Sequence, residues 1–341
     1  MKKSLTEKLE RLRTDPHGYR DFILADAKDA DMAMGMASPG EPHPPVDGKP
    51  FHTMDEFKEQ IRELVAQEKI DIMLTSVSVM DQLAHRELLF ADSPVTPAVR
   101  ANDTSDVWCG RGMSYGEKPS VPFATCYLPE VQHGSLNREG EGEPVVNLGL
   151  YSVTFNNDLD ADHRTLTEFR RFRAEAETRG FQYFLEVFGP NVDCGLAAEE
   201  IPAFVNDHIS RMLAAVPRSG RPLFLKIPFF GARWMEELAS YDSGVIVGVM
   251  GGGSGTTLDA FLLLEEAKKH GARAALYGRK IKAAEHPLTF VSFLREIADE
   301  RITAREAVKA YHAELEKLKI PPKRKLEDDL EITTNEMNYA R

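Results

Sequence analysis

The sequence predicts an α/β protein whose single domain is a closed (β/α)8 barrel, the TIM barrel, with a long loop after the third strand and a C-terminal helical extension. Eight short apolar runs are spread along the 341 residues, and segments with helical periodicity lie between them. Several runs are continuous rather than alternating, which is typical of parallel strands buried on both faces. A doubly wound open sheet is the alternative, but it more often has about five to seven strands and a glycine-rich turn after the first strand.

The expected strands are the eight apolar runs, in order Phe22 to Ala25, Ile70 to Thr75, Asp106 to Cys109, Val146 to Val153, Tyr183 to Val187, Leu223 to Ile227, Val245 to Val249 and Ala274 to Tyr277. Amphipathic helices are expected between them at Thr53 to Lys69, Leu166 to Thr178, Ile201 to Val216, Ala232 to Ala239, Leu258 to His270 and Leu288 to Ala298. The first of these helices begins with a capping box made by Thr53 and Glu56.

Three segments lie outside the regular units. The segment Ala37 to Pro50 carries five prolines, and Arg111 to Pro144 is rich in Gly, Pro and Glu between the third and fourth strands. Loops that follow barrel strands lie on the active-site face, so both are expected to be lids or substrate contacts, with decorative or oligomerising loops as the alternative. At the end of the chain, Thr303 to Leu318 is a helix capped by Thr303 and Glu306, and Pro321 to Arg341 is a polar tail expected to form an arm or to be partly disordered. The expected domains are therefore a catalytic barrel over residues 1–302, including an N-terminal helix, and an appended helix and tail over 303–341.

Composition limits the partners. The chain has 42 Lys and Arg against 54 Asp and Glu, a net charge of −12, which argues against binding to nucleic acid or to an anionic membrane. No apolar stretch approaches the roughly 20 residues of a membrane span. The N-terminal segment is charged and helix-like rather than a signal peptide, so a cytoplasmic location is expected.

Cysteine and histidine give little support for metal or disulfide chemistry. The three cysteines, Cys109, Cys126 and Cys194, are too few and too widely spaced for a disulfide framework or a zinc module. The ten histidines form no His-x-His or His-x-x-x-His pair. No metal site is expected, and Cys109, placed at the end of the predicted third strand, is interpreted as a core or pocket residue.

Glycines follow the seventh and eighth expected strands. The seventh strand leads through Gly251, Gly252 and Gly253 into a helix, and the eighth ends in Gly278 and Arg279. Backbone N–H groups at such a turn can face an anion, and loops after strands seven and eight form the common phosphate site of these barrels. The pattern predicts a phosphate cradle, with a flexible strand–helix turn as the alternative. Lys28 and Arg111 are possible further anion contacts or ordinary surface charges.

A lysine interrupts the apolar sixth strand. Lys226 stands in Leu223-Phe224-Leu225-Lys226-Ile227-Pro228. Burial lowers the pKa of a lysine, and a neutral amine can attack a carbonyl to form a Schiff base. Glu186 on the preceding strand and Asp26 on the first are acids near C-terminal strand ends, where they could transfer protons. The alternative is a structural ion-pair network.

These residues together resemble the Schiff-base-forming class I aldolases, in the branch of tagatose-1,6-bisphosphate aldolase, bacterial and archaeal class I fructose-bisphosphate aldolases and deoxyribose-phosphate aldolase. The resemblance covers about residues 20 to 300. It rests on an acid on the first strand, a Phe-Leu-Glu motif on the fifth, a lysine on the sixth and glycine-rich ends on the last two, which are here Asp26, Phe184 to Glu186, Lys226, Gly251 to Gly253 and Gly278-Arg279.

The resemblance implies cleavage or formation of a C–C bond in a phosphorylated ketose through an imine on Lys226, with a dihydroxyacetone-phosphate-like product. It implies proton transfer by Glu186, orientation of Lys226 or a substrate hydroxyl by Asp26, no cofactor beyond the covalent imine, and a homo-oligomer. The tagatose-type enzymes carry a lysine near the start of strand four, where this chain has Asn147, which argues against a bisphosphate substrate. Two other functions stay open: another imine-forming phosphosugar enzyme, thiolase- or isomerase-like, and a noncatalytic sugar-phosphate-binding barrel.

Overall fold

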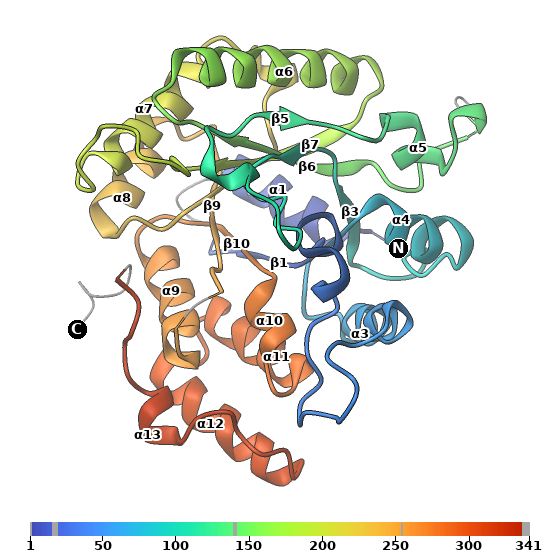
Figure 1. Cartoon of the computed structure of the whole chain (residues 1–341), viewed down its shortest axis with the longest axis vertical. Helices are drawn as coiled ribbons and strands as arrows, with labels where there is room; N and C mark the ends of the chain where they lie inside the picture. Colours follow the sequence, from blue (N-terminus) through green and yellow to red (C-terminus); the bar gives the residue numbers. More distant parts are fainter. Residues whose placement is uncertain (1, 16–19, 139–141, 254, 336–341) are drawn as a thin grey trace.

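Eight parallel strands close into a barrel in the computed structural model, which describes residues 2–15, 20–138, 142–253 and 255–335 (Figure 1). Their order around the barrel is β1-β10-β9-β8-β7-β6-β3-β2, and β2 pairs with β1 to close it. The strands are β1 Ile23–Lys28, β2 Ile72–Thr75, β3 Thr96–Arg100, β6 Leu148–Thr154, β7 Gln182–Phe188, β8 Leu225–Ile227, β9 Val247–Met250 and β10 Ala274–Tyr277. The predicted TIM barrel is confirmed, and the open sheet is excluded.

The third strand is the one that the sequence pattern misplaced. The structure has β3 at Thr96–Arg100, whereas Asp106 to Cys109 belongs to the excursion that follows it. Pro97 and Arg100 break the apolar pattern that marks the other strands. The charge of Arg100 is accommodated inside the barrel because it pairs with Asp29, which follows β1, and with Glu186 of β7, and a local pattern does not contain such distant partners. Cys109 accordingly does not end a strand and is exposed.

The expected helices are present with small shifts at their ends. Helices of the described chain are α1 Ser4–Thr14, α2 Asp31–Met34, α3 Met54–Gln67, α4 Val77–Met80, α5 Leu128–His133, α6 Leu159–Thr178, α7 Ile201–Leu213, α8 Ala232–Tyr241, α9 Thr257–Lys269, α10 Arg279–Ala283, α11 Pro287–Ala298, α12 Ala304–Lys317 and α13 Leu326–Asp329. The capping boxes at Thr53 and Thr303 are both formed. Helix α6 begins earlier than predicted, because the Asp158 carboxylate accepts a hydrogen bond from the Ala161 N–H and caps it there.

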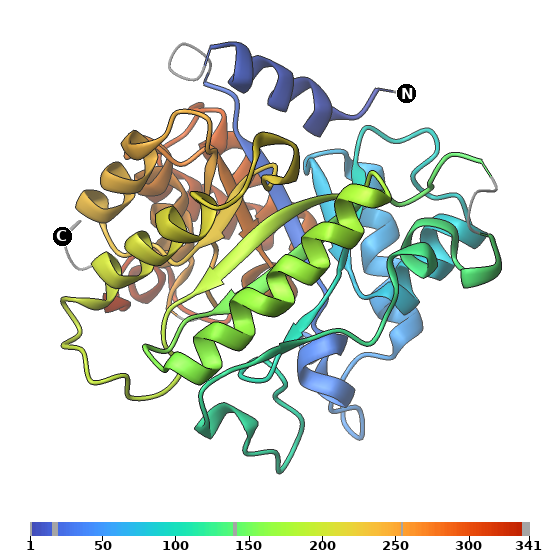
Figure 2. The ribbon, with the colours of Figure 1, turned by 90° about the horizontal axis from the view of Figure 1, so that it is seen from above.

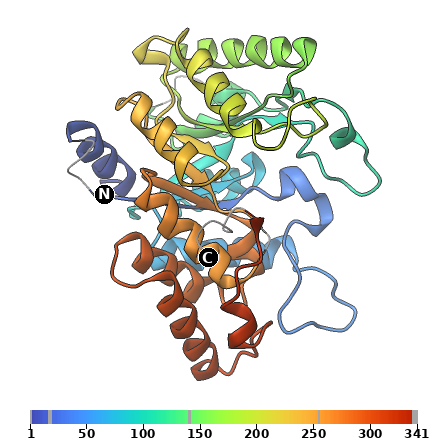
Figure 3. The same cartoon turned by 90° about the vertical axis from the view of Figure 1, so that its left-hand side faces the viewer.

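Strand residues alternate between two separate cores. Side chains such as Ile23, Ala25, Phe184 and Phe224 fill the barrel interior, where α1 adds three leucines, Leu5, Leu9 and Leu12. Figures 2 and 3 show α1 lying across one end of the barrel, while the loop over residues 38–52 projects from the opposite side. Helix α1 therefore closes the N-terminal end of the barrel, and the open end carries the loops that follow the strands.

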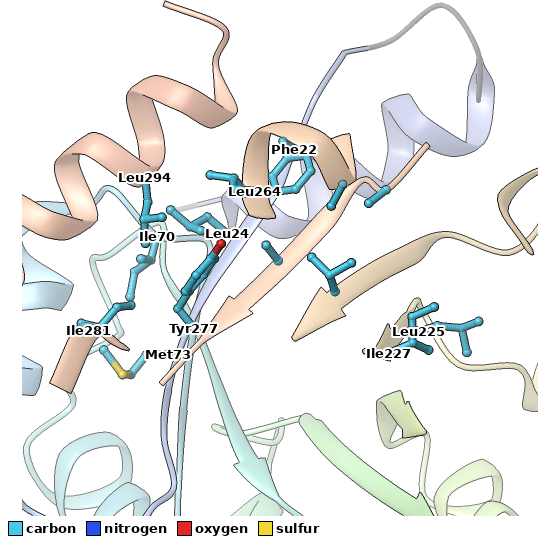
Figure 4. Packing of buried hydrophobic residues seen from close by; sticks show 14 of the residues in the cluster. Phe22, Leu24, Ile70, Met73, Leu225, Ile227, Leu264, Tyr277, Ile281 and Leu294 are labelled. Atoms are coloured by element: carbon cyan, nitrogen blue, oxygen red, sulfur yellow. The ribbon is translucent and has the colours of Figure 1, made fainter. Parts of the chain in front are cut away.

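The second core lies between the strands and the surrounding helices. Figure 4 shows part of it, with Tyr277 of β10 close to Leu24, Met73 and Ile281. The Tyr277 hydroxyl donates a hydrogen bond to the Ala260 carbonyl, 2.7 Å away, and so ties β10 to α9. Helix α12 contributes to this same core, which means that the sequence boundary near residue 302 does not separate two cores.

The part of the C-terminal tail that the structure describes is packed against the barrel instead of forming an arm. Asp329 of α13 and Ile332 are buried, and Asp329 accepts a hydrogen bond from the Thr257 N–H at the start of α9. Residues 336–341 of the predicted tail lie outside the described residues. Among the described helices, none has the length and apolar character needed to cross a membrane.

Candidate active site

Three polar side chains stand side by side inside the C-terminal half of the barrel. The sheet register pairs Ser152 of β6 with Glu186 of β7, and Glu186 with Lys226 of β8. They face inward because each strand alternates, and Phe184 and Phe224, two residues before Glu186 and Lys226, stack on each other in the interior core. The Ser152 hydroxyl donates to Glu186 Oε2 at 2.6 Å, and Lys226 Nζ forms an ion pair with Glu186 Oε1.

A buried arginine connects this row to the first strand. Arg100 of β3 donates from Nε to Asp29 Oδ2 at 2.5 Å, from one terminal nitrogen to Ser152 Oγ at 3.0 Å, and from the other to Glu186 Oε2 at 3.4 Å. Burial alone would raise the pKa of Asp29, but the charges of Arg100 and Lys226 and the hydrogen bond from Arg100 outweigh it and lower that pKa. The four ionisable residues form an alternating network of two anions and two cations.

The first strand presents Asp29, rather than Asp26, to this network. Ile23 and Ala25 belong to the interior core and Phe22 and Leu24 to the outer core, so residue 26 faces the helices and residue 29 follows the interior positions. Asp26 is fully buried, neither of its oxygens has a hydrogen-bond partner among the described residues, and Lys28 Nζ lies 3.8 Å away. Burial raises the pKa of Asp26 to about 7, against the opposing charge of Lys28.

The four ionisable residues of the network, Asp29, Arg100, Glu186 and Lys226, line a cavity of about 320 Å³ at the C-terminal ends of the strands. Its lining joins the ion network to both glycine loops and to the excursion after β3, and comprises Ala27, Lys28, Asp29, Ala30, Ala33, Met34, Phe57, Arg100, Asp106, Val107, Cys109, Glu186, Phe188, Lys226, Met250, Gly251, Gly252, Leu276, Gly278, Arg279 and Lys282. Asp26 is not part of that lining. Gly253 lies beside the lining, against the side chain of Arg279. Arg111 is exposed and does not line the cavity, so the structure does not bring this predicted anion contact to the site.

The glycines after β9 are required by packing and by backbone conformation. A Cβ on Gly251 would lie 2.2 Å from the Tyr277 ring, and Gly252 has φ of +56°, in the left-handed region. The Gly251 N–H already donates to the Leu276 carbonyl at 2.8 Å. These glycines let the chain turn tightly across the cavity mouth, but the Gly251 N–H is not available for an anion in this structure.

The positive end of helix α9 is not available for an anion either, contrary to expectation. The Thr256 N–H donates to Asp259 Oδ2, and the Thr257 N–H donates to Asp329 Oδ1, both at 2.8 Å. Two carboxylates of the chain itself therefore occupy the place that a phosphate was expected to take. Side-chain cations of the cavity lining are a further set of groups that could meet an anion.

Three cations gather beside β1 and β10. Lys28 Nζ is buried and has no hydrogen-bond partner among the described residues, and it lies 5.8 Å from the centre of the Phe57 ring. Arg279 and Lys282 line the same part of the cavity, and Lys282 Nζ donates to the Ser38 carbonyl at 3.1 Å. Burial lowers the pKa of Lys282, and the neighbouring charges of Lys28 and Arg279 lower it further. Lys282 was not among the predicted site residues, and it lies on the short helix α10 after β10.

The excursion between β3 and β6 covers the cavity with its first part. Asp106, Val107 and Cys109 line the cavity, and the Cys109 N–H donates to the Ala33 carbonyl at 2.8 Å. No described residue of 111–144 lines it. The predicted contact of this excursion with the cavity therefore comes from its first residues, which had been assigned to a strand.

Asn147 lies at the other end of the barrel from this chemistry. It precedes β6, and its side-chain amide donates to the Gly180 carbonyl at 2.9 Å. The residue of β6 that reaches the ion network is Ser152, five residues after Asn147. Within the described ranges, no group of three or more His, Cys, Asp and Glu side chains is arranged to hold a metal ion.

Among known proteins, only solved structures are similar to this chain, and the similarity is one of fold. No protein-family model matches the chain, and no curated protein matches it either. A Schiff-base-forming fructose-1,6-bisphosphate aldolase, studied through its reaction intermediates, superposes with a TM-score of 0.59 at 17% identity over 88% of this chain and 100% of that one. The fructose-bisphosphate aldolase from Slackia heliotrinireducens gives a TM-score of 0.63 at 14% identity, covering 91% of both chains.

An archaeal fructose-1,6-bisphosphate aldolase is similar as well, with a TM-score of 0.57 at 18% identity over 86% of this chain and 99% of that one. The structural neighbours of this chain therefore include Schiff-base class I aldolases, in agreement with the family that the strand motifs resemble. At these identities the likeness establishes the barrel fold that the chain shares with them.

Proposed function

We propose that this protein is a metal-independent class I aldolase that makes or breaks a C–C bond in a phosphorylated ketose through a Schiff base on Lys226. The observation that carries the proposal is the ion network itself. Lys226 is buried in an apolar strand, opens into a cavity, and is paired to a carboxylate that can take its proton. The barrel fold shared with Schiff-base aldolases supports the same reaction class.

Lys226 and Glu186 would carry out the imine chemistry. Glu186 accepts a proton from the Lys226 ammonium, and the free amine attacks the ketone carbon to form a carbinolamine. Glu186 then returns a proton to the carbinolamine hydroxyl, which leaves as water and gives a protonated imine. The hydrogen bond from Ser152 and the guanidinium of Arg100 hold the Glu186 carboxylate in place during both transfers.

Asp29 would act on the substrate hydroxyl, which the resemblance placed near Asp26 as an orienting group. In the cleavage direction Asp29 removes the proton of the hydroxyl two carbons from the imine carbon. The O–H electrons form the aldehyde, and the electrons of the breaking C–C bond move into the enamine and neutralise the imine nitrogen. Protonation of the enamine carbon and hydrolysis by water then release the ketone product and restore Lys226. The lowered pKa of Asp29 keeps it ionised for the first of these steps.

Lys28, Arg279 and Lys282 would hold the phosphate. The three cations lie on one side of the cavity. Lys28 makes no hydrogen bond to a described residue, and its ion pair with Asp26 is long, at 3.8 Å. Binding of the remote phosphate helps to place the ketone beside Lys226.

The self-association expected from the resemblance remains part of this proposal, and light scattering at micromolar concentration tests it.

Borohydride trapping tests the proposed mechanism. The protein is reduced in the presence of dihydroxyacetone phosphate, and intact-mass analysis and peptide mapping locate the adduct. We expect one adduct, on Lys226, and none in Lys226→Met or Lys226→Arg. The arginine variant preserves the ion pair with Glu186 but lacks a nucleophilic amine.

The matched control is Lys268→Met, which removes a lysine of similar burial on α9 that donates to the Ala298 carbonyl. It should trap as the wild type does. A folded wild-type protein that gives no adduct with dihydroxyacetone phosphate or with any member of a panel of ketose phosphates would favour a noncatalytic binding barrel. An adduct without C–C cleavage would favour another imine-forming enzyme.

A further inference from the structure

The two sides of the cavity carry opposite charge. Lys28 ends β1, and Arg279 and Lys282 lie on α10 directly after β10. The cavity wall across from them comes from the end of β7 and from the excursion that Asp106 ties to β6. Eight strands close the barrel, and in their order β7 lies four positions from β1 and β6 lies four positions from β10. The cationic side and the β6–β7 side are therefore diametrically opposed.

The β6–β7 side offers a carboxylate and apolar groups. Phe188 is the last residue of β7, and Val107 lies in the covering excursion. Asp106 is fixed there, because its carboxylate accepts hydrogen bonds from the Ser120 hydroxyl at 2.6 Å and from the Thr154 hydroxyl of β6 at 3.1 Å. The lining cations nearest to this side are Lys226 of β8 and Arg100 of β3, the strands that flank β7 and β6.

Both cations that flank the β6–β7 side are already paired with carboxylates. Arg100 has Asp29 at 2.5 Å and Glu186 at 3.4 Å, and both carboxylates are buried with it. Lys226 is paired with Glu186. A second phosphate at the β6–β7 side, with close to two negative charges, would face Asp106 without a counter-charge.

We propose, resting on the aldolase function above, that the substrate carries one phosphate, on the ketone side of the bond that breaks, and that the aldehyde half is an uncharged hydroxyaldehyde. The phosphate binds at Lys28, Arg279 and Lys282. The aldehyde half lies against Phe188 and Val107, where Asp106 can accept a hydrogen bond from one of its hydroxyls. The cavity thereby selects ketose 1-phosphates over ketose 1,6-bisphosphates, since like charges placed together in an enclosed site oppose binding.

The first measurement is the acceptor preference of the wild-type protein in the direction of synthesis. Dihydroxyacetone phosphate is supplied with glyceraldehyde or with glyceraldehyde 3-phosphate, and kcat/KM is compared. We expect a preference of about tenfold or more for the uncharged aldehyde, equivalent to about 1.4 kcal/mol. A smaller preference, or one for the phosphorylated aldehyde, would overturn the inference.

A binding measurement separates this inference from the proposed reaction, because it needs no turnover. Calorimetry on Lys226→Arg compares the 1-phosphates of fructose and tagatose with their 1,6-bisphosphates. The 1-phosphates should bind about tenfold more tightly, whereas equal or tighter binding of the bisphosphates contradicts the proposal even if Lys226 forms an imine. Borohydride trapping decides the imine independently.

Asp106→Asn tests the residue that the inference invokes. Removing the carboxylate charge should shift the ratio of kcat/KM values several-fold toward glyceraldehyde 3-phosphate. The control is Asp193→Asn, an exposed aspartate in the loop after β7 that does not line the cavity and should leave the ratio unchanged. An unchanged ratio in folded Asp106→Asn would show that this carboxylate does not exclude the second phosphate.

Discussion

Two acidic groups three residues apart, one on β1 and one directly after it, have opposite surroundings. Asp29 faces the barrel interior, where Arg100 donates to it and Lys226 is near enough to lower its pKa. Asp26 faces the helices, where Lys28 lies 3.8 Å away and neither oxygen has a described hydrogen-bond partner. The surroundings lower the pKa of the inner carboxyl, and burial raises the pKa of the outer one to about 7. The face of the strand, more than the nearness of a lysine in sequence, decides which chemistry each group can do.

The different surroundings of Asp29 and Asp26 predict that Asp29→Asn lowers kcat far more than Asp26→Asn does. Asp29→Asn removes the carboxylate that we assign to the substrate hydroxyl, so kcat should fall by about 10²- to 10⁴-fold. Asp26→Asn changes a group outside the cavity lining, and kcat should fall by less than about tenfold under the same principle. Steady-state cleavage of a ketose 1-phosphate measures both. The reverse ranking would return the catalytic role to Asp26.

The same contrast explains what could be predicted from the sequence. Hydrophobic runs and capping boxes are local, so they give the barrel, the helix starts at Thr53 and Thr303, and the positions of Lys226 and Glu186 on neighbouring strands. The assignment of Asp26 needed the inward or outward direction of each residue of β1. A run of four apolar residues buried on both faces, Phe22 to Ala25, does not reveal that direction.

Arg100 shows a second limit. A charged residue at the end of Thr96-Pro97-Ala98-Val99-Arg100 weakened the strand pattern, although this arginine is the centre of the ion network. Its partners are 71, 52 and 86 residues away in the chain, at Asp29, Ser152 and Glu186. A buried charge is tolerated only with such partners, and no local pattern contains them. The carboxylates that cap α9 were missed for the same reason, since Asp329 comes from the tail.

Removing the cation beside each carboxylate, Arg100 beside Asp29 and Lys28 beside Asp26, should lower the free energy of unfolding by different amounts. Arg100→Met leaves the buried Asp29 and Glu186 carboxylates without the guanidinium, so the free energy of unfolding should fall by about 3–5 kcal/mol. Lys28→Met removes an ammonium that makes no described hydrogen bond, and Asp26 can respond by taking up a proton, so the loss should stay below about 2 kcal/mol. Urea unfolding followed by circular dichroism measures both. Equal losses would mean that the inner network is no better compensated than the outer pair.

The last expected effect is on the pH dependence of stability. The folded state raises the pKa of Asp26 from the ordinary 3.8 to about 7, so between these values the folded protein holds a proton that the unfolded chain has released. Unfolding then releases a proton, and the free energy of unfolding should fall as pH rises from about 4 to about 7. Asp26→Asn removes this dependence.

The difference in unfolding free energy between Asp26→Asn and the wild type should therefore grow by a few kcal/mol from pH 5 to pH 8. Asp29→Asn is the matched control. The pKa of Asp29 is lowered, so its contribution is lost only as pH falls through that value, and its difference curve should stay flat between pH 5 and pH 8. A flat curve for Asp26→Asn as well would show that Lys28 keeps Asp26 ionised. The outer pair would then be an ordinary buried ion pair, and the contrast between the two faces of β1 would rest on hydrogen bonding alone.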